Sequence, residues 1–444
     1  MTLYPKRTDL MLIFKIILKS LLRNKLINTI LILSIAIAVS VACVLMKYYL
    51  VLSYNPLANK NDVVYSIRLD NWQGDEAFDR KNPVEPPWQI SFRDSQNLKN
   101  IALPKSMASM YRIRRPIQKS NSSDVNPFIS SIRVTEKGLF DIFDYKFIYG
   151  KAWNSSQNGE ALVVITKRAN EKLFDGDNSI GETVSIDSSI YTVVGVVDNA
   201  SLSPKIYDMN HGPSAEIEDY YIPFNYAVNN KIRTDGNVRC WSNDKIDTTD
   251  DLMNSECLWI QHWVELKNSN DIKGYRSLVN SYISEEQKIN RFKEVNKNRF
   301  DTPEELLIAR DVISSGQKNL IISAWTFAFL TVINTAILFF LIFWRRRKDY
   351  MIIIANGVSK FQLCISMLIE ALIIGFVSGL LSIIFSIAGI KLLKSIATAI
   401  SGSIFFDSSF VANSFLLAII FALVASIYAV FMVARNVTPE LLRA

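Results

Sequence analysis

The chain has 444 residues, of which 49% are hydrophobic, and its formal net charge is +7. The positive charge is concentrated in three segments: residues 1–27 carry a net +5, residues 344–361 a net +4 and residues 435–444 a net +1, whereas the rest sums to −3. Cations grouped at the ends of hydrophobic segments are typical of the cytoplasmic loops of membrane proteins. The charge distribution therefore argues against a nucleic-acid-binding protein, which would carry its cations on a soluble surface.

Four hydrophobic segments are each longer than the about 20 residues that a helix needs to cross a bilayer. They cover residues 28–53, 320–344, 363–392 and 410–433, and the polar block 54–318 separates the first from the other three. The sequence thus predicts a membrane protein with four transmembrane α-helices in a 1+3 arrangement. A large extracytoplasmic α+β domain is inserted between the first and the second. The first segment is too long for a signal-peptide core, so we expect a retained helix.

The charge distribution also predicts the topology. The positive-inside rule places the N-terminus, the loop 345–361 and the tail 435–444 in the cytoplasm, so the block 54–318 and the short loop near 393–409 face outward. Residues 1–27 include Lys15, Lys19 and Arg23 at four-residue intervals within an apolar run. This spacing predicts a basic amphipathic helix over residues 11–25, lying along the cytoplasmic leaflet.

The polar block alternates between segments typical of strands and segments typical of helices. Strands are predicted at 63–70, within 128–198 around a helix at 167–174, and at 258–266, and a helix is predicted at 271–295. The core would comprise about 54–198 and 258–302, and the irregular stretch 199–257 would be an insertion. Nearby Trp241, Trp259 and Trp263 could pack in the core or bind a ligand. Residues 303–319 predict a stalk helix that continues into the second span.

Two of the four cysteines, Cys240 and Cys257, lie in the outward block, where oxidising conditions permit a disulfide. The alternative is two separately buried thiols. A metal site that combines this pair with His262 or His211 matches no zinc spacing, so we expect no metal.

Catalytic motifs are missing from the sequence. It contains no G-x-x-x-x-G-K-[ST] loop, no G-x-S-x-G and no H-E-x-x-H. The predicted spans contain no pair of carboxylates that could serve as acid and base. We therefore expect a non-catalytic chain that binds no cofactor of its own.

Glu370 is a carboxylate well inside a predicted span, and a charge there must be paired or protonated. A helix-packing hydrogen bond to Thr331, Asn334 or Thr335 is favoured over a proton or substrate relay. Small residues four apart, Gly375 and Gly379, predict a close contact between helices on the same span.

The segment RRRKDYMIIIANGVSKFQLCISMLIEALIIGFVSG (345–379) carries the clearest motif. It resembles the cytoplasmic turn between the second and third spans of MacB/FtsX-type ABC transporter permeases. In that family a basic cluster precedes an acidic residue, an Ala-x-Gly-x-Ser turn and a helix with an inward glutamate. The matching positions here are Arg346, Arg347, Lys348, Asp349, Ala355, Gly357, Ser359 and Glu370.

The departures are small. Asp349 stands where glutamate is usual, Tyr350 and Met351 where Ile-Gly is typical, and Ile354 and Asn356 where a basic or apolar residue is commoner. The first span, the section 138–197 and the ending TPELLRA are also similar to the family, so only about 199–257 is without a counterpart.

The resemblance implies a permease that dimerises and binds a separate cytoplasmic ABC ATPase, which would hold the ATP and Mg. The loop 345–361 would be the ATPase-coupling element, formed by the motif residues named above, although its cations could also serve as ordinary membrane anchors. ATP-driven closure would then move the outer domain, a mechanism called mechanotransmission. The chain would lie in the bacterial inner membrane and export a peptide, toxin or hydrophobic drug, with a periplasmic adaptor and an outer-membrane duct as further partners.

Two alternatives remain open. Within the family, the chain could extract lipoproteins or regulate a cell-wall hydrolase. Outside it, the chain could be a membrane receptor, but its inner segments are all shorter than about 30 residues, too short for an output domain.

Overall fold

The computed structural model describes residues 25–74, 77–80, 82–120, 127–198, 205–208, 210, 217–242, 245–292, 297–310, 315–355, 357–396 and 407–437. The chain forms two compact units, a membrane unit (residues 1–51 and 313–444) and a core domain (residues 52–312). The predicted helix at 11–25, most of the loop near 393–409 and most of the tail lie outside the described residues.

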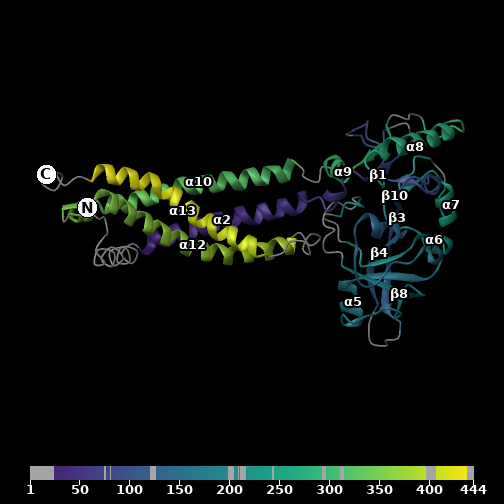
Figure 1. The fold of residues 1–444 in the computed structure, drawn as a ribbon, viewed down its shortest axis with the longest axis horizontal. Helices are drawn as coiled ribbons and strands as arrows, with labels where there is room; N and C mark the ends of the chain where they lie inside the picture. Colours follow the sequence, from purple (N-terminus) through teal and green to yellow (C-terminus); the bar gives the residue numbers. More distant parts are fainter. Residues whose placement is uncertain are drawn as a thin grey trace. The chain divides into compact units, whose positions relative to one another are not determined.

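The membrane unit confirms the predicted 1+3 arrangement of spans (Figure 1). Its helices are α2 (Lys25–Ser53), α10 (Ser315–Arg345), α11 (Arg347–Ala355), α12 (Lys360–Ile396) and α13 (Ser408–Asn436). The four apolar stretches contain 27, 28, 36 and 29 residues, so each is long enough at about 1.5 Å per residue to cross a hydrocarbon layer of about 30 Å.

Helix α12 lies against α13 where its side chains are smallest. A Cβ atom added at Gly375 would lie 2.9 Å from the Cβ of Ala422, and one at Gly379 would lie 2.7 Å from Cδ2 of Phe415. Both glycines of the predicted packing motif therefore face α13, and their lack of a side chain permits the close approach.

The core domain is built on one mixed sheet. In the described residues the strands follow the order β11-β1-β10-β3-β4-β9-β6-β8-β5, with β2 paired to β10 and β7 paired to β3 and β8. The strands are β1 (Val64–Arg68), β2 (Ile90–Ser91), β3 (Ser106–Lys119), β4 (Phe128–Thr135), β5 (Lys146–Gly150), β6 (Leu162–Thr166), β7 (Thr183–Ile186), β8 (Ser189–Asp198), β9 (Tyr220–Pro223), β10 (Leu258–Glu265) and β11 (Arg299–Asp301).

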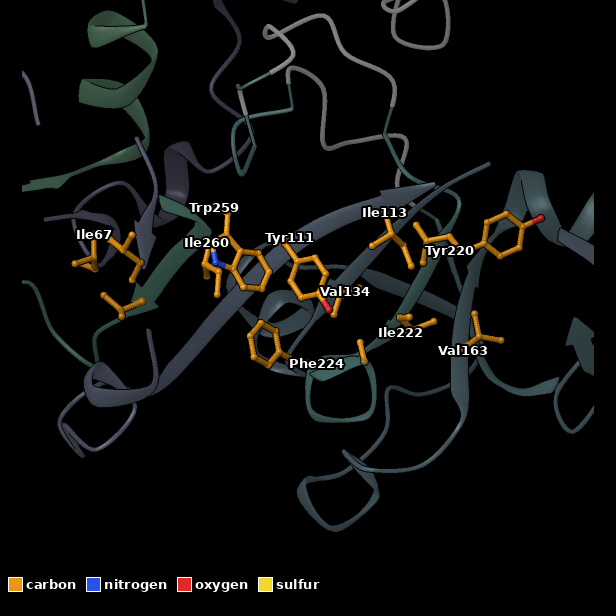
Figure 2. Packing of buried hydrophobic residues seen from close by; sticks show 14 of the residues in the cluster. Ile67, Tyr111, Ile113, Val134, Val163, Tyr220, Ile222, Phe224, Trp259 and Ile260 are labelled. Carbon is orange, nitrogen blue, oxygen red and sulfur yellow. The ribbon is translucent and has the colours of Figure 1, made fainter. Parts of the chain in front are cut away.

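Short helices accompany the sheet. They are α3 (Phe92–Leu98), α4 (Gly138–Ile142), α5 (Lys167–Phe174), α6 (Phe224–Asn229), α7 (Thr249–Asn254), α8 (Asp271–Gln287) and α9 (Pro303–Ala309), with the 3₁₀ turns η1 (Ala58–Lys60) and η2 (Ser155–Gln157). Because side chains alternate along a strand, neighbouring strand residues enter two separate hydrophobic clusters. Figure 2 shows the first cluster, in which Tyr111, Phe224 and Trp259 gather. The rings of Tyr111 and Trp259 meet edge to face at 4.9 Å.

Three predicted elements differ from the structure. The segment 199–257 is not wholly an insertion, because β9 lies inside the sheet, parallel to β4 and antiparallel to β6. The helix expected at 271–295 ends at Gln287, since Asn290 and Phe292 adopt positive φ angles of 59° and 55° that a right-handed helix does not allow.

Of the two alternatives for the tryptophans, the structure shows packing: Trp259 and Trp263 are 2% and 1% exposed, so both pack in the core.

The helix expected over 303–319 is also shorter. Helix α9 ends at Ala309, where Arg310 caps it in a non-helical conformation, and α10 begins at Ser315. Thr302 accounts for the start of α9, because its side chain accepts a hydrogen bond from the backbone N–H of Glu305 while the Glu305 carboxylate accepts one from the backbone N–H of Thr302.

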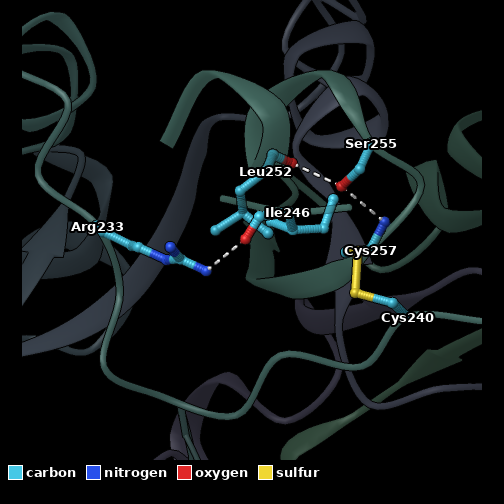
Figure 3. The surroundings of a disulfide bond; sticks show 6 residues. All are labelled: Arg233, Cys240, Ile246, Leu252, Ser255 and Cys257. Atoms are coloured by element: carbon cyan, nitrogen blue, oxygen red, sulfur yellow. Dashed lines mark hydrogen bonds between the residues drawn. A yellow bond between two sulfur atoms is a disulfide. The ribbon is translucent and has the colours of Figure 1, made fainter. Parts of the chain in front are cut away.

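The structure joins Cys240 and Cys257 by a disulfide (Figure 3). The bond attaches the segment before residue 242 to the start of β10, where Arg239 and Leu258 also form a two-residue bridge. Among the described residues no cluster of metal ligands occurs. His262 is buried, with its Nδ1 2.9 Å from the hydroxyl of Ser109, and burial lowers the pKa of its imidazole to about 3. His211 lies outside the described residues.

Candidate coupling site

The segment 345–361 forms a corner between two spans, with a short helix of its own. Helix α10 ends at Arg345, Arg346 makes the turn, and α11 begins at Arg347. The backbone N–H of Arg346 donates to the carbonyl of Phe343 at 3.1 Å, and the N–H of Tyr350 donates to the carbonyl of Arg346 at the same distance. The short helix expected in this segment is therefore present, at Arg347–Ala355 in place of about 349–360.

The Gly and Ser of the Ala-x-Gly-x-Ser motif each have a local structural function. Gly357 has a φ of 92°, which suits glycine because it has no Cβ, and its N–H donates to the carbonyl of Ile354 at 2.9 Å. Ser359 then caps α12. Its hydroxyl accepts from the N–H of Gln362 at 3.2 Å, and the Gln362 side chain accepts from the N–H of Ser359 at 2.9 Å. The sequence thus ends one helix and begins the next within a few residues.

A buried ion pair connects this corner to α12. The guanidinium nitrogen Nη1 of Arg346 lies 3.0 Å and 2.9 Å from the two carboxylate oxygens of Glu370, and the two side chains are 6% and 4% exposed. The expected partners of Glu370, Thr331, Asn334 and Thr335, are replaced by this arginine. A charged partner explains how a carboxylate is tolerated inside a span.

The same pair corrects the role expected of Arg346. Because its guanidinium is buried against Glu370, it is not presented on the surface of the corner. The other predicted coupling residues are exposed: Arg347, Lys348, Asp349, Ala355, Gly357 and Ser359. Together they present cations, one carboxylate and small side chains to the surroundings.

Two exposed apolar side chains extend this surface and were not among the predicted site residues. Ile352 is 52% exposed and Phe361 is 74% exposed. Lys348, Ile352 and Ala355 are spaced by four and three residues, so they share one face of α11. An isoleucine four residues after Lys348, and so on the same helix face, is the signal that could have identified it.

On the core domain, the segments that connect to α2 and α10 lead into adjacent strands. Strand β1 follows the first segment and β11 precedes α9, and the two pair antiparallel with Ile67 opposite Phe300. Arg68 joins them further, since its Nε lies 2.5 Å from a carboxylate oxygen of Asp301 in the interior. The two connecting segments are therefore attached to one strand pair.

Cations fix both segments to other parts of the core domain. On the first, the ammonium of Lys60 lies 2.5 Å from a carboxylate oxygen of Asp144 and donates to the carbonyl of Asp141 at 2.8 Å. On the second, the guanidinium of Arg310 stacks 4.1 Å from the ring of Trp88. Burial lowers the pKa of Arg310 to about 10, which leaves it charged at neutral pH.

Comparison with known proteins gives a family for each part of the chain. Residues 27–282 match the model of the MacB-like periplasmic core domain, and residues 321–437 match the FtsX-like permease C-terminal model. A comparison with curated proteins finds no match.

Solved structures similar to the chain include two isolated domains. The periplasmic region of MacB from Actinobacillus actinomycetemcomitans is 15% identical with a TM-score of 0.33, over 54% of this chain and 100% of that one. The extracellular domain of the noncanonic ABC-type transporter YknZ from Gram-positive bacteria is 14% identical with a TM-score of 0.31, over 50% and 95%. The family of the chain follows from the two family models and not from these structures. The chain belongs to the MacB/FtsX-type family and is an ABC transporter permease subunit.

Proposed function

We propose that the chain couples ATP hydrolysis by a separate cytoplasmic ATPase to movement of its own core domain. The ATPase holds the ATP and Mg. The permease works as a dimer in the bacterial inner membrane, with both termini in the cytoplasm and the core domain outside. The concentration of cations at residues 1–27, 344–361 and 435–444 supports this orientation.

The observation that carries the proposal is the construction of the α10–α11–α12 corner. Its outer surface is exposed and mixes charges with the apolar side chains of Ile352 and Phe361, a composition suited to docking a protein. Its inner side is fixed to α12 through Arg346 and Glu370. A push on α11 is therefore transmitted to a span and not absorbed by a flexible loop.

The core domain is built to receive such a movement. Since both connecting segments enter the β1–β11 pair, a shift of the attached spans would act on one strand pair that is hydrogen-bonded into the sheet through β10. This arrangement supports mechanotransmission, in which no catalytic group of the permease takes part.

The cargo that we propose is a peptide, toxin or drug with a hydrophobic portion. In the membrane unit a mostly apolar cavity of about 380 Å³ lies between α2, α10 and α13, with Met46, Leu50 and Trp325 in its lining. Lys47 and Asp407 form an ion pair at 3.0 Å in the same lining. A periplasmic adaptor and an outer-membrane duct would carry the cargo onward.

The test is affinity purification of the tagged chain in mild detergent, followed by mass spectrometry and an ATPase assay. We expect a P-loop ATPase to co-purify and to hydrolyse ATP in a vanadate-sensitive manner. Ile352→Glu together with Arg347→Glu should abolish both binding and stimulation, because the docking surface is lost.

Arg435→Glu is the matched control. Arg435 is exposed in the last turn of α13, so the variant repeats the charge reversal of Arg347→Glu away from α11 and should leave stimulation intact. Purification of the chain without any nucleotide-hydrolysing partner would contradict the proposed function and favour a receptor.

A further inference from the structure

Asn334 is a polar residue that the membrane unit leaves uncovered at mid-depth. It lies 11 residues before the end of the 318–345 span, and its side chain is exposed. At least ten residues from either end of the four described spans, every other exposed position is apolar. The Asn334 carboxamide has no hydrogen-bond partner among the residues that the structure describes.

A bilayer cannot supply that partner. Acyl chains offer no donor or acceptor, so an amide that faces them stays unsatisfied, whereas polar side chains inside membranes commonly bond across helices. The neighbouring hydroxyl groups on α10 are not hydrogen-bond partners of Asn334, because Thr331 donates to the carbonyl of Phe327 and Thr335 is buried. None of these described side chains supplies the partner, and a second chain packed against this face would.

The residues around Asn334 form a continuous strip along α10. At 100° per residue, Ser323, Phe327, Leu330 and Leu341 all fall within about 40° of the direction of Asn334. The three apolar members are 45%, 52% and 51% exposed, and Ser323 is exposed as well. We call these five residues the Asn334 face.

We propose that the Asn334 face contacts the same face of a second copy of this chain, with the two Asn334 carboxamides hydrogen-bonded to each other across a two-fold axis. A carboxamide carries both a donor and an acceptor, so it is complementary to itself. A two-fold axis brings one residue opposite its own copy, as an isologous interface requires. The inference rests on the paired permease of the proposed function and names its contact surface.

Disulfide crosslinking of the full chain in native membranes tests the interface. In a background of Cys43→Ala and Cys364→Ala, Asn334→Cys should form a covalent dimer under mild oxidation. Val424→Cys is the matched control: it is 52% exposed on α13, 16 residues from the outer end of its span, as is Asn334. Ile333→Cys, one residue away on α10, gives the angular control. We expect Asn334→Cys to crosslink at least tenfold faster than Val424→Cys.

A second measurement does not depend on cysteine chemistry. Energy transfer between donor- and acceptor-labelled copies in liposomes gives the dimer dissociation constant. Asn334→Leu should raise it by about three- to tenfold, while Asn334→Gln, which keeps the carboxamide, should raise it less.

The outcomes separate the two proposals. Equal or faster crosslinking through Val424, or a dissociation constant that Asn334→Leu leaves unchanged, would overturn the inference; stimulation of the ATPase by the same preparation would leave the proposed function standing. A chain that binds no ATPase would instead count against the proposed function.

Discussion

The side-chain oxygen Oδ1 of Asn61 accepts a hydrogen bond from the backbone N–H of Glu304 at 3.1 Å, which joins two segments 243 residues apart in the chain. Asn61 lies between the 3₁₀ turn η1 and strand β1, and Glu304 lies in the first turn of α9. The same oxygen accepts from the side-chain amide of Asn55 at 3.2 Å. The two connecting segments of the core domain are thus bonded directly to each other.

Removing this contact should loosen α9. Asn61→Ala eliminates the hydrogen bond to Glu304, worth about 1 kcal/mol, together with the one from Asn55, so we expect amide hydrogen exchange in residues 303–309 to accelerate about fivefold. Hydrogen–deuterium exchange with mass spectrometry measures this. Asn178→Ala is the control, because Asn178 also accepts a backbone N–H, that of Ile180, but lies elsewhere in the core domain. Unchanged exchange in α9 would show that the contact contributes nothing.

The buried pair of Arg346 and Glu370 should matter most when only one partner is removed. Glu370→Gln leaves the guanidinium of Arg346 buried without its carboxylate, so we expect a loss of about 3–5 kcal/mol, whereas Arg346→Met with Glu370→Leu should be much milder. A thiol-reactive dye that reports exposure of Cys43 and Cys364 on heating measures the stability of the membrane unit. Equal melting temperatures for the single and the double variant would contradict the prediction that an unpaired buried charge destabilises the membrane unit.

The disulfide between Cys240 and Cys257 should stabilise the core domain. It closes a loop with a sequence separation of 17, for which the loss of unfolded-state entropy corresponds to about 3 kcal/mol. Cys240→Ser with Cys257→Ser should therefore lower the melting temperature by about 6–12 °C, followed by tryptophan fluorescence. Cys43→Ala with Cys364→Ala removes two thiols from the membrane unit and should leave this transition unchanged.

His262 should make the core domain sensitive to acid. Its pKa falls from 6.5 to about 3 through burial, with Lys99 adding to the effect. Between those values the unfolded chain binds a proton that the folded chain does not, so stability is full above pH about 6.5 and declines by at most about 1.4 kcal/mol per pH unit as pH falls toward 3. Denaturant unfolding at several pH values measures the slope, and His262→Gln should reduce it.

An unchanged pH dependence in the His262→Gln variant would point to other titratable groups. If His262→Gln unfolds with the same pH dependence as the unmodified chain, the acid sensitivity comes from carboxylates such as Glu218. The guanidinium of Arg133 and the ammonium of Lys205 hold the pKa of that buried carboxyl below its ordinary value despite burial. Its protonation would destabilise the fold at lower pH.

The sequence alone determined the spans, the family and the turn at the α10–α11–α12 corner. Twenty or more consecutive apolar residues leave a backbone in lipid no choice but a helix, so length and hydropathy suffice to locate the spans. The turn is equally local. A glycine at positive φ and a serine that caps the next helix act on neighbouring atoms, so the resemblance to the family's Ala-x-Gly-x-Ser turn was enough to indicate Gly357 and Ser359.

What the tertiary structure decided was the identity of partners distant in the chain. The sequence indicated that Glu370 needs a partner but could not select Arg346 over Thr331 or Thr335, because that choice depends on how the α10–α11 corner turns toward α12. The place of β9 beside β4 and the bond between Asn61 and Glu304 depend in the same way on chain packing. Such contacts join segments tens or hundreds of residues apart, and no local spacing encodes them.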